Sequence, residues 1–169
     1  WQECTPIDTA ALVPRVRCGE PLRVNTRHHR RVTRAHRELG SSPVAGSSLE
    51  ALRGRALVDL RTADTASAPI ERAVAALEEA HRRAPDDAGV LNDLAVAYLA
   101  LGERTQQLTP MLRALDAVER AAAADSANLS ILFNRALILQ RLYLIKSAER
   151  AWRRYLAVER DPRWRGEAR

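Results

Sequence analysis

The sequence predicts an all-α protein built from antiparallel helical hairpins that stack on one another. Apolar residues make up 46% of the 169 residues and are mostly alanine and leucine, while aromatic residues make up only 4%. This composition favours helices over strands. In residues 127–161 apolar residues recur at helical spacing in two runs, which are separated only by Leu142–Leu144. Two helices joined so tightly must lie antiparallel, and one such pair cannot bury both apolar faces without stacked neighbours.

Small residues mark corresponding positions in three successive hairpins. One alanine falls on the first helix of each hairpin and another on the second, in the pairs Ala56 and Ala73, Ala95 and Ala114, Ala136 and Ala148. A small residue is needed at such positions because a branched side chain would hold the helix axes apart. We therefore expect each alanine to lie at a close helix contact.

The middle hairpin carries the most complete pattern. Leu94, Ala95, Tyr98 and Gly102 follow one another on its first helix as a large apolar residue, a small residue, a tyrosine and a glycine. This succession resembles the tetratricopeptide repeat (TPR) pattern. The resemblance implies about three TPR-like repeats, which form an α-solenoid over residues 47–169.

Several features depart from the family pattern. Insertions fall at two inner turns, in residues 61–68 and 103–109, and Ser126 replaces the usual closing proline. Tyr143 stands where the turn glycine is expected, and Tyr155 replaces the last small residue. A generic antiparallel helical array without true repeat geometry is the alternative.

The N-terminal part, residues 1–46, is predicted to be an irregular arm. Pro6 and Pro14 interrupt its apolar positions, while Asn25 can cap one helix that ends at Gly40. The outer face of that helix is basic, with Arg27, Arg30, Arg31, Arg34 and Arg37. Such a helix could bind an anionic membrane surface peripherally or a nucleic acid; the alternative, which we favour, is a solvated helix packed on the repeats. We do not expect nucleic-acid binding.

The helices of the repeat region have their own boundary signals. Ser47 and Glu50 are predicted to form a capping box that starts a helix ending near Thr62. Pro69 opens the next helix, which ends before Pro85. Later boundaries are marked by Asp86 and Asp87, Gly102, Thr109 and Pro110, Asp125 and Ser126, and finally Asp161 and Pro162.

Cys4 and Cys18 are the only cysteines of the chain. In an oxidising compartment they could form a disulfide that closes the proline-containing loop between them, and in the cytoplasm they would be free thiols. The sequence begins at Trp1, so an upstream signal or anchor could lie outside it. The compartment is open, with a slight preference for an extracytoplasmic, periplasmic location.

The sequence carries no motif of a catalytic or metal site. It has no glycine-rich phosphate loop, no nucleophile elbow and no HExxH pattern. His28, His29 and His36 cluster in the basic helix, but the neighbouring arginines would repel a cation. We therefore expect neither an enzyme nor a cofactor or metal.

The first helices of stacked hairpins line one concave face, where we expect a partner to bind. The repeat register places these side chains on it: Arg53, Asn92, Val96, Leu99, Phe133, Asn134, Leu137 and Arg141. Apolar residues among amide and guanidinium groups suit an extended peptide or a helix. The alternative is that some of these residues pack under the N-terminal arm.

Two long segments and the cysteine-bearing arm resemble a more specific group of proteins. Residues 91–104 and 133–164 look like the helical region that precedes the caspase-like domain in bacterial CHAT proteins. The resemblance implies a recognition module, because the peptidase cysteine and histidine of that family lie beyond the repeats. We predict a non-catalytic adaptor or scaffold that docks a protein or peptide partner in a larger assembly. The alternatives are the regulatory region of a CHAT-type peptidase and a basic accessory subunit at an anionic membrane surface.

Overall fold

A computed structural model describes residues 48–63, 67–162 and 165. Within them the chain forms six helices and no strand, which confirms the all-α prediction. The helices are α2 (Leu49–Thr62), α3 (Ala68–Arg83), α4 (Ala88–Thr105), α5 (Leu108–Ala124), α6 (Leu129–Arg141) and α7 (Ile145–Val158). The predicted arm, its basic helix and both cysteines lie outside the described residues.

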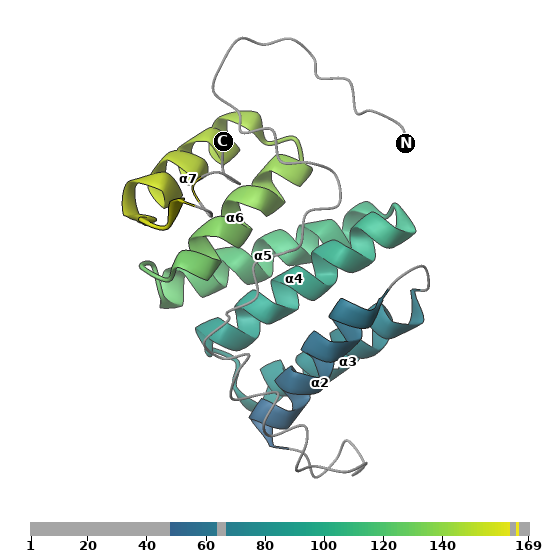
Figure 1. Cartoon of the computed structure of the whole chain (residues 1–169). Helices are drawn as coiled ribbons and strands as arrows, with labels where there is room; N and C mark the ends of the chain where they lie inside the picture. Colours follow the sequence, from purple (N-terminus) through teal and green to yellow (C-terminus); the bar gives the residue numbers. More distant parts are fainter. Residues whose placement is uncertain (1–47, 64–66, 163–164, 166–169) are drawn as a thin grey trace.

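Consecutive helices pair into three antiparallel hairpins, α2 with α3, α4 with α5 and α6 with α7 (Figure 1). The second helix of one hairpin packs on the first helix of the next, and the first helices α2, α4 and α6 also contact one another in order. The connections inside the second and third hairpins lie at the same edge of the stack (Figure 1). This is the stacked arrangement that the alanine spacing predicts.

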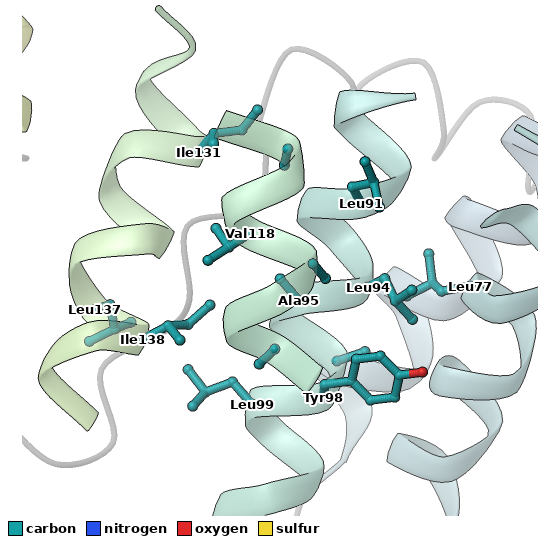
Figure 2. Close-up of a cluster of buried hydrophobic side chains, with 14 of the residues drawn as sticks. Leu77, Leu91, Leu94, Ala95, Tyr98, Leu99, Val118, Ile131, Leu137 and Ile138 are labelled. Carbon is teal, nitrogen blue, oxygen red and sulfur yellow. The ribbon is translucent and has the colours of Figure 1, made fainter. Parts of the chain in front are cut away.

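The predicted small residues lie in the core of the stack. Each of the six is fully buried: Ala56, Ala73, Ala95, Ala114, Ala136 and Ala148. Around them α4 forms the centre of the core, with Leu91, Leu94 and Leu99 between Leu77 of the first hairpin and Ile138 of the third (Figure 2).

Gly102 also marks a close approach. A Cβ atom on Gly102 would lie 2.4 Å from Met111 Cγ and 3.1 Å from the Gln107 carbonyl oxygen, so only glycine lets α5 turn back so closely on α4.

Most helix boundaries agree with the predictions, but two starts and one end differ. The predicted stop at Gly102 is wrong, because α4 continues to Thr105 and Gln106 takes the left-handed C-cap position. Ser48, and not Ser47, caps α2 by accepting a hydrogen bond from the Ala51 amide, which places Glu50 too early in the helix to complete a capping box. The fourth helix begins at Leu108, one residue before Thr109. Asp87 caps α4 as predicted, accepting from the Val90 amide at 2.8 Å.

The turn between α6 and α7 has left-handed backbone geometry at a large residue. Tyr143 has a φ of 57° at the position where the TPR pattern has glycine. Its amide donates to the Gln140 carbonyl at 2.9 Å, and the Leu144 amide donates to the Leu139 carbonyl at 3.0 Å. These two bonds form a Schellman-like turn, which normally favours glycine at the left-handed residue. The turn therefore places a tyrosine in backbone geometry that usually requires glycine.

Candidate functional site

The predicted concave-face residues lie on the first helices of the hairpins, α2, α4 and α6. The structure buries seven of the eight, whereas the sequence leads us to expect side chains open to a partner. Arg53, Asn92, Val96, Leu99, Phe133, Asn134 and Leu137 are at most 8% exposed, and only Arg141 is half-buried. For Arg53, Asn134 and Phe133 the contacts give the physical reason, because these side chains join neighbouring elements of the fold.

Arg53 joins the first two hairpins. Its Nε donates to Asp93 Oδ2 at 2.8 Å, and its Nη2 lies at the same distance from that oxygen. Asp93 is on α4 and both side chains are buried. A buried charge without a partner would strongly destabilise the fold, so this ion pair holds the two hairpins together and is not available to a partner protein.

Two further polar contacts join the second and third hairpins. Asn134 Nδ2 on α6 donates to Asn92 Oδ1 on α4 at 3.0 Å, away from solvent. Near the other end of the same helices, Arg141 Nη1 donates to Glu103 Oε1 at 2.7 Å. The amide and guanidinium groups that the sequence suggests for a partner thus bind the adjacent repeat.

Phe133 belongs to an aromatic cluster with α7. Its ring centroid lies 5.2 Å from that of Trp152 and 5.3 Å from that of Tyr155, and both contacts are edge-to-face. Trp152 Nε1 donates to Gln140 Oε1 at 2.8 Å, which ties the cluster back to α6. Phe133 is 2% exposed, so it packs as a core residue of the third hairpin.

A groove of about 470 Å³, which we call the outer groove, lies over α4 between α3 and α5. Leu91 and Leu94 of α4 and Ala117 of α5 are its buried apolar residues. The remaining lining residues are His81, Tyr98, Thr109, Leu112, Arg113, Asp116 and Arg120. Leu112 is 51% exposed, so one wall is apolar and open to solvent.

Three polar side chains of the outer groove are held in place by their neighbours. Tyr98 OH donates to Glu78 Oε1 at 2.6 Å; burial, followed by this hydrogen bond, raises the pKa of Tyr98 to about 12. The Arg113 guanidinium carbon lies 5.8 Å from the centroid of the Tyr98 ring. Arg120 Nη2 donates to the Pro85 carbonyl at 3.2 Å, and its Nη1 lies 3.5 Å from His81 Nε2.

Sequence reasoning missed the outer groove because it assigned the partner surface to the first helices only. The groove residues lie mainly on α5, a second helix. One signal was available: Leu112 falls outside the stripe formed by Ala114, Ala117, Val118 and Ala121, which the α5 core uses. A leucine off the buried stripe marks an apolar side chain that the helix packing does not need.

A second exposed feature, the apolar edge, lies at the connections inside the second and third hairpins. It consists of Leu108, Tyr143, Leu144 and Ile145, all exposed, with Leu108 at 60% and Tyr143 at 85%. These connections share one edge of the stack (Figure 1).

Other predicted sites are not reached by the structure. The basic residues Arg27–Arg37 and the Cys4–Cys18 pair lie outside the described residues. In the part of the chain that is described, no group of three or more histidine, cysteine or acidic residues could hold a metal ion. No helix of that part has the length and apolar character needed to cross a membrane.

The described helices define a TPR-like helical-repeat fold, and comparison with solved structures agrees. TTC0263, a thermophilic TPR protein from Thermus thermophilus, aligns with a TM-score of 0.64 at 22% identity, over 85% of this chain and 72% of that one. MamA from MSR-1 aligns with a TM-score of 0.56 at 16% identity, over 79% and 68% of the two chains. MamA from AMB-1 aligns with a TM-score of 0.54 at 16% identity, over 79% and 65%. No family model and no curated protein matches the sequence.

Proposed function

We propose that this chain is a non-catalytic, TPR-like interaction module that docks a protein partner within a multi-subunit assembly. The observation that carries the proposal is the apolar edge. Leu108 and Tyr143 expose large apolar side chains at adjacent hairpin connections, where the fold does not bury them. Large apolar side chains left exposed along one edge of a fold are typical of sites where proteins bind one another.

The backbone at Tyr143 supports the same proposal. A bulky residue in the left-handed region costs free energy that glycine would avoid. Tyr143 adopts that conformation and is 85% exposed, so the side chain adds little to the packing of its own chain. Tyrosine is among the residues that dominate binding energy at protein interfaces, which would offset the local strain.

The test is partner capture from the native source by the whole chain, read by quantitative mass spectrometry and cross-linking. The double variant Leu108→Ser, Tyr143→Asn removes the apolar edge, and asparagine tolerates the left-handed backbone. Val158→Ser is the matched control, because Val158 is 48% exposed but ends α7 at the opposite edge of the stack. We expect the double variant to lose a stoichiometric partner that Val158→Ser retains. Equal capture by both variants would refute the apolar edge as the docking surface.

Few of the predicted concave-face residues are accessible to a partner in this structure. Arg141 stays accessible at the rim, whereas Phe133 and Leu137 could reach a partner only after a rearrangement of the face that buries them. Docking through this face stays a prediction.

The resemblance to the helical region of CHAT proteins also stays a prediction. It would make this chain the recognition part of a peptidase. The deciding observation is whether the natural gene continues beyond Arg169 into a domain with a cysteine–histidine pair. Peripheral binding to anionic membranes through Arg27–Arg37 would instead collapse between low and moderate salt in a vesicle flotation assay.

A further inference from the structure

The outer groove has the size and lining of a ligand-binding site. It is an open hollow of about 470 Å³, so a ligand would lie across it and stay partly in solvent. Leu91, Leu94 and Ala117 give it a buried apolar floor, and the exposed Leu112 gives it an apolar wall. It lies on the side of the second helices, so it is separate from the concave face that the first helices line.

Two arginines on α5 give the outer groove its charge. Arg113 and Arg120 are seven residues apart, which places them about 10.5 Å apart along the helix axis and on similar faces. Neither has an ion-pair partner within 4.0 Å in the part of the chain that the structure describes. Arg113 packs over the Tyr98 ring and Arg120 is hydrogen-bonded to a carbonyl, so both guanidinium groups are held while most of their N–H donors stay available.

The other titratable lining residues determine which charge a ligand should carry. Asp116 lies between the two arginines in sequence and is the only acidic residue of the lining, while Glu78 lies just outside it and accepts the hydrogen bond of Tyr98 OH. The lining is therefore net positive, with its positive groups at both ends of an apolar floor. Carboxylates are the natural partners of arginine donors, and a leucine-like side chain fits the floor.

We propose that the outer groove binds an acidic–apolar peptide segment of the partner protein, with apolar side chains against Leu91, Leu94 and Leu112 and carboxylates on Arg113 and Arg120. This inference rests on the proposed function and names the partner chemistry of a second surface. Charge complementarity selects this occupant, because a basic peptide would meet two arginines. A polyanion without apolar side chains would leave the floor unused.

The experiment measures fluorescence polarisation of a labelled eight-residue probe with glutamates around two leucines, added to the whole chain. Two comparison probes replace the glutamates by lysine or the leucines by serine. We expect the acidic–apolar probe to bind at least tenfold more tightly than either comparison probe. Equal binding of the acidic probe with serine would reduce the site to non-specific anion binding and overturn the proposal.

Variants then locate the binding site. Arg113→Gln and Arg120→Gln should each weaken probe binding about tenfold, as losing a charge-assisted hydrogen bond does. Arg150→Gln, which removes the same charge from an exposed position on α7, is the matched control and should change little. Asp116→Asn should strengthen binding about threefold by removing a like charge. A misfolded variant could lose probe binding but could not gain it, so the tighter binding of Asp116→Asn tests the site independently of folding. If the arginine variants bind the probe as wild type does and Asp116→Asn gains nothing, the proposal is overturned.

Native capture separates this inference from the function on which it rests. If Arg113→Gln retains the native partner but the apolar-edge variant does not, the interaction function stands and the outer-groove assignment fails. If the wild-type chain captures no partner while the probe binds as described, the proposed assembly fails and the peptide site stands.

Discussion

Arg53 on α2 and Asp93 on α4 form a buried ion pair, with the Arg53 Nε atom 2.8 Å from Asp93 Oδ2. Forty residues separate them in sequence, and the pair spans the contact between the first two hairpins. This pair also shows why a residue that looks suited to a partner can be committed to the fold. From the sequence alone, an arginine on the concave side of a first helix is interpreted as a binding residue. The structure shows that the guanidinium is already paired with the Asp93 carboxylate.

Asp93→Ala is expected to destabilise the chain by about 3–5 kcal/mol, because it leaves the Arg53 charge buried without its partner. The double variant Arg53→Met, Asp93→Leu removes both charges and should recover most of this loss. Urea unfolding followed by circular dichroism would measure both. A double variant no more stable than Asp93→Ala would show that the destabilisation comes from changed packing and not from the uncompensated charge.

Phe133→Ala is expected to destabilise the chain by about 3–5 kcal/mol, the usual loss for a buried aromatic residue. If Phe133 were exposed, Leu132→Ala would lower the free energy of unfolding clearly more than Phe133→Ala. Because Phe133 contacts Trp152 and Tyr155, we expect the two substitutions to lower it by similar amounts. Melting of the two variants side by side, with Val158→Ala as the exposed control, makes the comparison. A melting temperature for Phe133→Ala equal to that of wild type would restore the exposed interpretation.

Tyr143→Gly should stabilise the isolated chain by about 0.5–1 kcal/mol, because glycine relieves the left-handed strain at a φ of 57° and the lost side chain is mostly in solvent. Tyr143→Ala is the control, since it removes the ring but retains the Cβ that causes the strain. Chemical denaturation of both variants gives the difference. If Tyr143→Gly is less stable than Tyr143→Ala, the turn is not strained at this residue.

Tyr98 should make stability depend on alkaline pH. Its folded-state pKa of about 12 lies above the value of about 10 expected in the unfolded chain, so the folded state binds this proton more tightly. The contribution is complete below pH 10 and is lost as pH rises from 10 to 12; a shift of two units amounts to about 2–3 kcal/mol. Unfolding at about pH 9 and about pH 11.5 should show this loss for the wild-type chain. Tyr98→Phe, which lacks the titrating hydroxyl, should lose less stability over the same interval.

The fold could be predicted because its signals are local or periodic. Ala95 and Ala136 mark positions that the stack buries completely, and Asp87 identifies a helix start. The two starts that differ from the prediction, at Ser48 and Leu108, are shifted by one residue, because neighbouring residues offer similar signals.

The candidate site could be predicted only in part, because exposure depends on which side chains meet across hairpins. The register places Asn92 and Asn134 correctly on first helices, but a hydrogen bond between residues 42 positions apart leaves no periodic trace in the sequence. The outer groove is missed for a similar reason. Its floor on α4 and its arginines on α5 become one site only when α3, α4 and α5 are packed.

The polar contacts between first helices make the order of the hairpins specific. The first hairpin offers Arg53 to Asp93, whereas the second offers Asn92 to Asn134, so each junction is bonded by a different chemistry. A chain from which α4 and α5 were deleted would bring Arg53 against α6, which has no carboxylate in its sequence LSILFNRALILQR. The cost of burying that guanidinium without a counter-charge would oppose the shortened stack. Hairpins of this protein are therefore not interchangeable modules, and loss or exchange of the central one should yield a chain that does not close into an ordered solenoid.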